Sequence, residues 1–316
     1  MIAPATRLNR TEVDTGAAYL LGAFRLDDRW RFSAGLRRDT FDIAAATGPS
    51  DYSSEPATTR HDSDFTNWNL GVVYKPESNG SLYASVSTSS NPPGEQVDSG
   101  TAASYGGLAA GFQNFAPERN ANYEVGVKWN LFDERLNVAG AVFQTAKEDQ
   151  LSAAGRGSSA RYANDGASRA RGFSVSIAGS VSERLDLFGG FARLDTEVTA
   201  HSLNPDAVGK TLANVPEFSA SLQSRYQVTP AIAVGGTLYY QSELYGGTLE
   251  ARDTRIPGYL RVDFMGEYRW SERMDLRLNV VNAADKTYYD TLYRSSVPFV
   301  YVAPGRLAQL TLSVKI

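Results

Sequence analysis

The side chains that most often carry out catalysis or bind metal ions are scarce in this chain of 316 residues. It has no cysteine and two histidines, His61 and His201, which stand in separate polar segments where we expect them to be solvated. Two isolated histidines do not make a zinc site, and without thiolates neither a disulfide framework nor a cysteine-based metal site can form. The glycine pairs at 106–107, 189–190 and 235–236 lack the strand–helix context of a phosphate-binding loop, and no nucleophile elbow is present. The sequence therefore predicts neither an enzyme nor a resident metal or cofactor.

The composition narrows the class of protein further. The net charge is −4, with both signs interleaved and no basic stripe, so nucleic acid is not expected as a partner. No stretch approaches the roughly 18 apolar residues of a membrane helix. The 17 tyrosines, 14 phenylalanines and 28 glycines are typical of many half-exposed β-strands.

Apolar and polar residues alternate along most of the chain with a period of two. In 123–130, Tyr, Val, Val and Trp fall on one face, and Glu, Gly, Lys and Asn fall on the other. The same rhythm recurs at 30–37, 260–270, 274–280 and 308–316. Because side chains of a strand point to opposite faces in turn, each segment predicts a strand with one apolar and one polar face.

This rhythm predicts about thirteen strands, at roughly 11–26, 30–43, 63–75, 81–89, 118–130, 135–148, 166–180, 185–198, 214–227, 231–243, 257–270, 274–286 and 304–316. Short turns are expected at 27–29, 76–80, 131–134, 182–184, 228–230 and 271–273. Long loops are expected at about 44–62, 90–117, 149–165, 199–213, 244–256 and 287–303. Short and long connections alternate throughout.

This alternation favours a transmembrane antiparallel β-barrel in the outer membrane. Bacterial barrels have short periplasmic turns and long outer loops, and their strands are longer than those of ordinary sheets. Aromatic residues recur near the expected strand ends, as an interfacial girdle requires: Trp30, Tyr74, Trp129, Tyr226, Tyr268 and Trp270. The alternative is a soluble β-protein, which has no reason to gather its long loops on one side.

The odd strand number predicts that residues 1–316 form only part of a barrel domain. A closed single-chain barrel of this class has an even number of strands. An open sheet would leave unpaired backbone groups facing lipid. The first residues also lack the basic and apolar regions of a secretory signal. We therefore expect several strands and any plugging domain to be encoded upstream.

A succession of short motifs resembles the distal half of TonB-dependent siderophore receptors. The motifs are Val73-Tyr74-Lys75-Pro76-Glu77-Ser78-Asn79-Gly80-Ser81-Leu82-Tyr83-Ala84-Ser85, Asn91-Pro92, Pro117-Glu118, Tyr123-Glu124-Val125-Gly126-Val127-Lys128, Ala141-Val142-Phe143, Leu212-Ala213-Asn214-Val215-Pro216, Ile256-Pro257-Gly258-Tyr259, Leu278-Asn279-Val280-Val281-Asn282, Asp285-Lys286-Thr287-Tyr288-Tyr289 and Ala303-Pro304-Gly305-Arg306. The last of these, with the terminal strand, is similar to the catecholate-type branch. The resemblance implies a barrel of 22 strands, of which this chain supplies the last thirteen. The chain departs from the family in lacking the plug domain and the TonB-contacting segment, and in ending at Ile316 where the family has Phe.

The resemblance implies an outer-membrane receptor segment for TonB-dependent uptake of ferric siderophores. Its partners would be the ferric siderophore, outer-membrane lipid and the TonB complex, reached through a plug domain absent from this chain. Because a ferric catecholate is bulky, aromatic and anionic, guanidinium groups and flat aromatic faces would bind it. The candidates are Arg156, Arg161, Tyr245, Arg252, Arg255, Tyr293, Arg294, Phe299 and Tyr301, with Tyr105, Phe112 and Phe115 as further aromatic surface.

Other interpretations stay open at this point. The candidates could be ordinary loop or girdle residues. A set of charges on the polar faces is expected to form ion pairs in the barrel wall or contacts with a plug: Glu124, Lys128, Arg261, Asp263, Glu267, Asp275 and Arg277. The chain could also be a passive outer-membrane pore, or an inactive fragment of a receptor gene.

Overall fold

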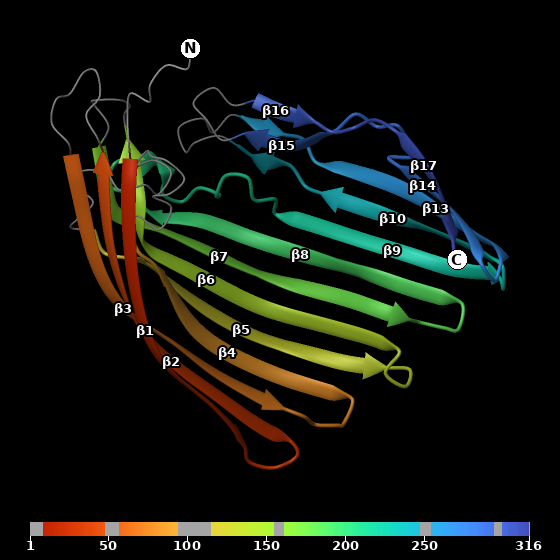
Figure 1. Ribbon diagram of the computed structural model, residues 1–316, viewed down its shortest axis with the longest axis horizontal. Coiled ribbons are helices and arrows are strands. Elements are labelled where there is room, and N and C mark those ends of the chain that lie inside the picture. The colour runs from red at the N-terminus through yellow and green to blue at the C-terminus, as the bar shows by residue number, and fades with distance from the viewer. Residues whose placement is uncertain are drawn as a thin grey trace.

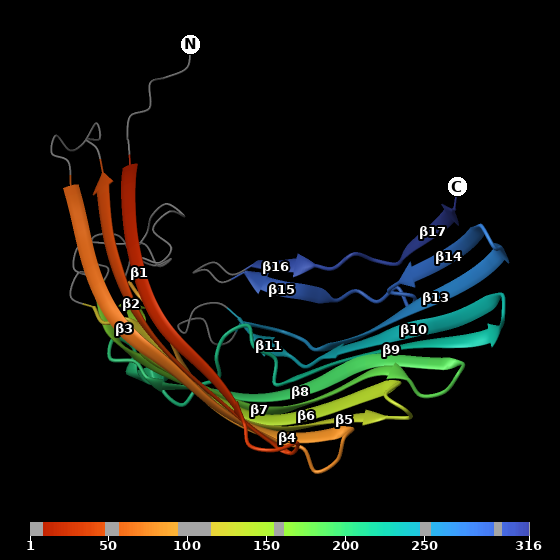
Figure 2. The ribbon, with the colours of Figure 1, turned by 60° about the horizontal axis from the view of Figure 1, so that its bottom comes forward.

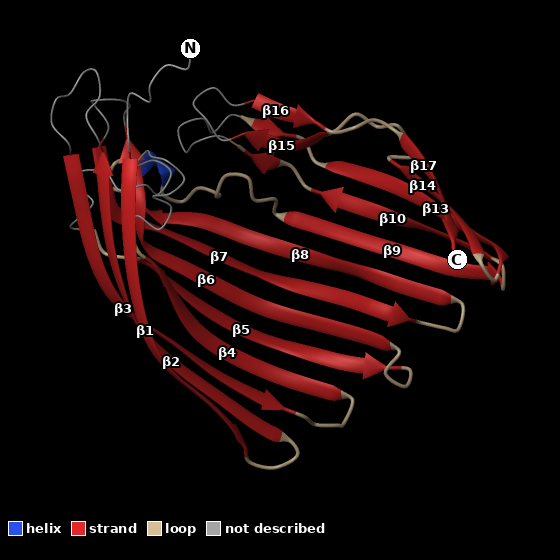
Figure 3. Ribbon diagram, in the orientation of Figure 1, coloured by secondary structure: helices blue, strands red, loops and turns tan. Residues whose placement is uncertain are grey.

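The computed structural model describes residues 9–47, 57–93, 115–154, 161–246, 254–293 and 299–315. Thirteen strands form one antiparallel sheet, in which each strand pairs with the next sheet strand along the chain (Figure 1). The helical structure in the described ranges is the short 3-10 helix η5 (Pro205–Ala207), so that strands dominate the picture (Figure 3). The predicted all-β class and the count of thirteen strands are confirmed. Within the same ranges, no helix combines the length and the apolar character needed to span a membrane.

The sheet strands are β1 (Asn9–Arg25), β2 (Trp30–Thr47), β3 (Ala57–Tyr74), β4 (Gly80–Asn91), β5 (Glu118–Leu131), β6 (Leu136–Ala154), β7 (Arg161–Ser180), β8 (Leu185–Ala200), β9 (Phe218–Thr229), β10 (Ile232–Gln241), β13 (Tyr259–Ser271), β14 (Met274–Val281) and β17 (Leu307–Val314). Two further pairs stand apart from this sheet. They are β11 (Leu244–Tyr245) with β12 (Arg255–Ile256), and β15 (Tyr289–Tyr293) with β16 (Phe299–Val302). Strands of two to five residues are too short for a periodic signal, and the sequence did not predict these four.

Short turns and long connections lie at opposite ends of the sheet, as the sequence predicts (Figure 1). Two long connections are shorter than expected. The β2–β3 ladder runs without a break to Thr47, opposite Ala57, and β6 and β7 pair as far as Ala154 and Arg161. The apolar alternation stops there because polar side chains follow. The backbone pairing continues, because hydrogen bonds between backbone N–H and C=O groups do not depend on which side chains the strands carry.

Two strand ends fall short of the prediction for a different reason. β9 begins at Phe218 instead of 214, after Pro216, which has no N–H to donate to a ladder. β14 ends at Val281 instead of 286, because Asn282 and Asp285 adopt left-handed backbone angles, φ 51° and 52°.

The sheet curves into an open trough with β1 and β17 at its two edges (Figure 2). Ile43 on β2 packs with Leu151 on β6, although three strands separate them in the sheet. Such a contact can form only across the hollow, so the Ile43 side of the sheet is concave. Arg31 lies on the same side of β2 as Ile43, because side chains alternate with a period of two. Directly paired residues of neighbouring strands share a face, so Val73, opposite Arg31, and Tyr83, opposite Val73, are on the concave side as well.

The two faces of the trough differ in chemistry. On the convex face of β4 and β5, Leu82 pairs with Val127, and Ala84 pairs with Val125, which is 62% exposed. On the concave face of the same strands, Ser85 pairs with Glu124. On these two strands the expected division into an apolar and a polar side is therefore present, and the apolar side faces outward.

Tyr83 shows how the concave wall is packed. Its ring covers Gly126 on the neighbouring strand, where a Cβ atom would collide with it. The hydroxyl group donates a hydrogen bond of 2.6 Å to Glu124, and the ammonium group of Lys128 lies 5.3 Å from the ring centroid. Glycine at 126 is needed because the close approach of the ring leaves no space for a side chain.

Candidate functional site

The two small sheets join two long loops into one unit at the long-loop end. Leu244 of β11, Ile256 of β12 and Leu292 of β15 are buried against one another, with Tyr289 packed on them. Leu292 lies directly over Gly246, where a Cβ atom would overlap its side chain. The loops 242–258 and 282–306 therefore share a hydrophobic core.

The loop 201–217 is attached to the same unit. The backbone N–H of Asn214, at φ 60°, donates a hydrogen bond of 2.6 Å to the carbonyl oxygen of Tyr245. Earlier in the loop, the carbonyl oxygen of Lys210 accepts a hydrogen bond from the N–H of Val198 on β8, and the side chain of Thr196 accepts from the N–H of Leu212 at 3.1 Å. Three successive long loops are thus linked.

Asn282 fixes the base of the last loop and is completely buried. Its side-chain amide donates to the carbonyl oxygens of Lys286 at 2.9 Å and Pro304 at 3.3 Å, and its amide oxygen accepts from the N–H of Lys286 at 3.0 Å. Its own N–H donates to the carboxylate of Asp263 at 2.8 Å. One side chain therefore holds together the point where the loop leaves β14 and the point where it returns to β17.

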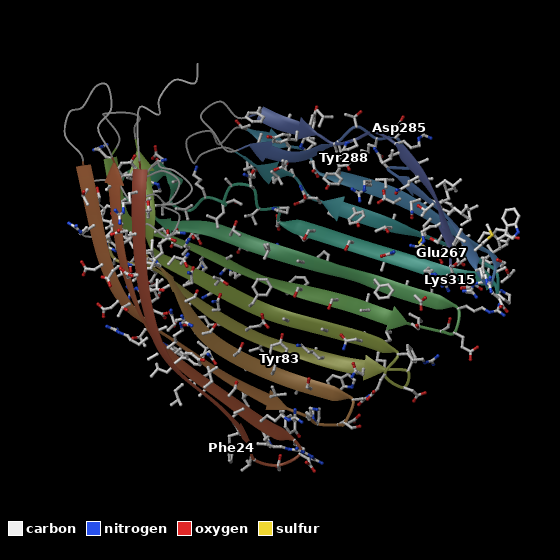
Figure 4. The ribbon with its side chains drawn as sticks, in the orientation of Figure 1. Phe24, Tyr83, Glu267, Asp285, Tyr288 and Lys315 are labelled. Atoms are coloured by element: carbon white, nitrogen blue, oxygen red, sulfur yellow. The ribbon has the colours of Figure 1, made fainter. Side chains whose placement is uncertain are left out.

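Asp285 adds a charged link at the same place (Figure 4). Its carboxylate accepts the backbone N–H of Arg306 at 2.9 Å, and the guanidinium of Arg306 lies at 3.4 Å. These two hydrogen bonds hold the pKa of the Asp285 carboxyl below its ordinary value of 3.8, because they favour the ionised form.

Tyr288 connects the last loop to the concave wall. It is buried, its ring centroid lies 4.4 Å from that of Tyr259, and its hydroxyl oxygen accepts from Arg261 at 3.2 Å. Arg261 also donates to Asp263 at 2.9 Å and lies 4.1 Å above the ring of Tyr239. Both terminal nitrogens of the guanidinium thus have internal partners, and this cluster positions the loop above it.

Several of the predicted ligand-binding residues come together on this unit. Tyr245 and Arg255 are opposite each other in the β11–β12 pair, and Arg255 lies 3.5 Å from Glu243. The rings of Phe299 and Tyr301 on β16 are 5.5 Å apart in an edge-to-face arrangement, and both are about half exposed. Tyr293 pairs with Phe299 in the backbone ladder of β15 and β16.

Other predicted residues lie elsewhere. Arg161 begins β7, which β8, β9 and β10 separate from β13 in the sheet. Phe115 packs near Ile43 on the concave side of the long-loop end, and not with the β11–β16 unit. Arg156, Arg252, Arg294, Tyr105 and Phe112 lie outside the described residues.

The expectation for the histidines was wrong in one case. His61 is not in a solvated loop, because β3 extends over it, and it is buried with its Nε2 atom against the Ser63 hydroxyl. His201 follows β8, where its Nδ1 atom accepts the N–H of Asn204 at 3.0 Å. No group of three His, Asp or Glu side chains within the described ranges is arranged to hold a metal ion.

Charged side chains form a chain of ion pairs on the concave wall near the short turns. Glu267 on β13 pairs with Arg225 on β9 at 2.8 Å and with Arg277 on β14 at 2.7 Å, and Arg225 also approaches Asp186 on β8 at 3.7 Å. The predicted ion pairing of Glu267, Arg277, Arg261, Asp263 and Asp275 in the wall is confirmed, with Asp275 paired to Arg269 at 3.7 Å. Glu124 and Lys128 instead contact Tyr83.

The sequence did not single out Asn282, Tyr288 or the Asp285–Arg306 pair as functional residues. A signal for the first was present, because an asparagine that directly follows a strand and precedes Asp285 is typical of a turn with left-handed backbone. Nothing local predicts that Tyr288 reaches Arg261, 27 residues away.

Comparison with known proteins agrees with this architecture. A family model described as TonB dependent receptor-like, beta-barrel, matches residues 2–283. The chain is 34% identical over 313 residues to the probable TonB-dependent receptor BfrD of Bordetella pertussis, and 30% identical over 315 residues to the probable TonB-dependent siderophore receptor PiuA of Acinetobacter baumannii. Each alignment covers 96% of this chain and 41% of the relative, so the chain spans about two fifths of their length.

The structural comparison gives the same result. The crystal structure of PiuA from Acinetobacter baumannii superposes with a TM-score of 0.86 and 28% identity, covering 96% of this chain and 43% of that one. The match extends over the thirteen-stranded sheet, which corresponds to part of a receptor barrel of the outer membrane. Receptors of this family are transporters and not enzymes, in agreement with the prediction from the sequence. The chain therefore belongs to the family of TonB-dependent receptor β-barrels.

Proposed function

We propose that this chain forms part of the wall and outer loops of a receptor that takes up ferric siderophores across the outer membrane. The observation that carries the proposal is the loop unit built on β11, β12, β15 and β16, which places guanidinium and aromatic groups side by side at the long-loop end. A relative with 30% identity bears the name of a siderophore receptor, which supports this class of ligand.

The ligand-binding residues we propose are Tyr245, Arg255, Tyr293, Phe299 and Tyr301 on this unit, together with Arg161 at the start of β7 and with Arg156, Arg252 and Arg294, which lie outside the described residues. A ferric catecholate presents flat aromatic rings and negative charge. Half-exposed tyrosine and phenylalanine rings can stack on its rings, and arginine can pair with its oxygen atoms. The Arg255–Glu243 pair is exposed and therefore weak, so that a stronger anion can replace the carboxylate.

The same proposal includes the domain organisation. Within the described residues, β1 and β17 each pair on one side only, and an open edge in a membrane must find a partner. We propose that residues 1–316 are one part of a larger receptor barrel, whose other strands cover these edges. Release of the ligand inward would then depend on a plug domain and on the TonB complex.

Equilibrium binding tests the ligand class. The natural protein would be extracted in detergent, and its tryptophan fluorescence would be titrated with a ferric catecholate siderophore and, separately, with a ferric hydroxamate siderophore. We expect tighter binding of the catecholate, and losses of about tenfold for Arg255→Ala and for Tyr301→Ala.

Arg269→Ala is the matched control, because this arginine lies at the short-turn end of β13 and should leave binding unchanged. Equal affinity for all proteins would show that the loop unit is not the site. Absence of binding to any ferric siderophore, together with ion conductance in planar bilayers, would favour a passive pore instead.

A further inference from the structure

A row of apolar residues crosses the loop unit and ends on β16. Leu244 of β11 pairs with Ile256 of β12, and both are buried together with Leu292 of β15. Leu292 in turn pairs with Val300 of β16, and directly paired residues share a face, so Val300 is on the side of this core. The exposed fraction is at most 5% at the first three residues and rises to 39% at Val300. The row therefore stays apolar beyond the point where it is covered.

Val302 extends this exposed surface along β16. It lies two residues after Val300, on the same face of the strand, and is 62% exposed. The hydrophobic core of the loop unit is thus open on one side, at two valines. Apolar side chains on a strand with a free edge are suited to pairing with a further strand.

The backbone of β16 is open as well. Among the described strands, β16 pairs with β15 alone. The β15–β16 pair continues the ladder of β14 and β17, because the N–H of Ala303 donates a hydrogen bond of 3.0 Å to the carbonyl oxygen of Tyr288. β16 and β17 consequently lie along the same edge of the molecule (Figure 2). An element that pairs with the free side of β17 is therefore in position to reach β16.

We propose that an extended segment from the upstream part of the receptor pairs with β16 and covers Val300 and Val302. This inference rests on the proposal above that upstream strands cover the edge of β17, and it does not depend on the identity of the ligand. The segment would be the outer continuation of the strand that pairs with β17. Its backbone N–H and C=O groups would bond to β16, and its apolar side chains would face the two valines, as in other cases of β-strand addition.

A second copy of the chain is a poorer occupant, because the strand that covers β17 would take the same side of β16. The added strand also bears on the proposed ligand site. Phe299 and Tyr301 are on the opposite face of β16 from the two valines. The segment would therefore hold the strand that carries these two rings without covering the rings themselves.

Thiol labelling of the natural full-length receptor on whole cells tests whether the valines are covered. Val300→Cys and Val302→Cys would be treated with a membrane-impermeant maleimide, and labelling would be read at the introduced residue by mass spectrometry. Both should react about tenfold more slowly than exposed loop positions, because a covered thiol reacts only when the added strand opens.

Two controls supply the exposed positions. Val208 in the loop 201–217 has a similar exposure, 43%, and Thr291 is exposed on the other face of the β15–β16 pair, opposite Tyr301. Val208→Cys and Thr291→Cys should react quickly. Heat-modifiable migration in gels would confirm that every variant is folded. Equal rates at the valines and the controls would overturn the proposal.

A photoreactive amino acid in place of Val302 identifies the occupant. We expect a crosslink to a peptide upstream of residue 1 of the same molecule. A crosslinked dimer, a crosslink to another protein or a crosslink within 1–316 would overturn the proposal.

The same probe in place of Thr311 on β17 separates this inference from the proposed barrel closure. A crosslink from Thr311 to an upstream peptide, without one from Val302, would refute the strand addition and leave the larger barrel in place. Absence of both upstream crosslinks would refute the larger barrel as well.

Discussion

The convex and concave faces of the sheet consist of the same strands, yet each face is suited to a different solvent. On the convex face, large apolar residues such as Leu20, Val125 and Leu310 are more than 60% exposed. On the concave face, charged groups pair with each other across several strands, as Glu267 does with Arg225 and Arg277. In a soluble protein the first face would be a large exposed apolar patch, which monomers rarely tolerate.

The difference shows where the stability of this fold comes from. The buried residues of the described chain are few, their two hydrophobic clusters lie at the long-loop end, and no continuous core runs through the described part of the sheet. Strand pairing satisfies the backbone, lipid covers one face, and polar networks fill the other. A new charge should therefore destabilise the protein on the convex face and be tolerated on the concave face.

The largest effect is expected from a charge in the middle of the convex face. Val125→Arg should lower the free energy of unfolding by about 2–4 kcal/mol, because the guanidinium would lie near the centre of the hydrocarbon layer. The control is Ser85→Arg on the concave face, where Glu124 is the opposite residue and can pair with the new charge. Urea unfolding in lipid vesicles, followed by tryptophan fluorescence, measures both. Equal losses would contradict the division into two faces.

Removal of the Asn282 side chain is expected to have the next largest effect. Asn282→Ala leaves the buried N–H and carbonyl groups of the loop base without partners, which should cost about 2–3 kcal/mol. Hydrogen exchange should accelerate in the segment 282–306. The exposed pair of Asn137 with Asn130 provides the control, and Asn137→Ala should change stability by less than about 0.5 kcal/mol. Unchanged exchange in the variant would show that Asn282 does not hold the loop.

A smaller effect is expected in the ion pairs of the concave wall. Glu267→Gln removes the carboxylate shared by Arg225 and Arg277 and should destabilise the protein by about 1–2 kcal/mol, because Glu267 is mostly shielded from water. Asp275→Asn, in the half-exposed pair with Arg269, should cost less than about 0.5 kcal/mol. Urea unfolding measures both variants. An equal loss of unfolding free energy in the two would contradict the stronger role of the shielded pairs.

The smallest effect depends on pH. Because the pKa of Asp285 is lowered below 3.8 in the folded protein, its carboxylate stabilises the loop base fully above that pH. The contribution is lost as the pH falls through the folded pKa. Asp285→Asn should therefore increase loop opening near neutral pH and have no effect well below pH 3.8, as measured by limited proteolysis of the loop. A difference that persists in acid would show that the effect is not due to the charge.

The fold was predictable from the sequence because its signal repeats in every element. Thirteen strands follow from the period of two, and the alternation of turns and loops follows from their lengths. The strand ends were less predictable, since backbone pairing in β2 and β3 continues past the apolar residues. β14 instead ends earlier than predicted, because the left-handed backbone of Asn282 stops the strand, and the apolar pattern gives no sign of that stop.

The candidate site was predictable only as a set of residue types. Arginine and tyrosine in long loops could be recognised from the sequence, and Tyr245 and Arg255 do lie together. The attachment of this pair to the β15–β16 pair depends on the contact of Leu244 with Leu292, which brings together residues of two different loops. No local pattern encodes such a contact, because it arises from packing between segments that are distant in the sequence.

The most direct test of the two-solvent account is an accessibility scan along β4. The chain has no cysteine, so single cysteines can carry spin labels at Leu82, Ala84 and Val86 on the convex face, and at Ser85 and Ser87 on the concave face. In lipid vesicles, we predict that oxygen dissolved in the bilayer relaxes the first three labels, and that a water-soluble nickel complex relaxes the other two. Loss of this alternation, with all five labels reporting the same environment, would contradict the account.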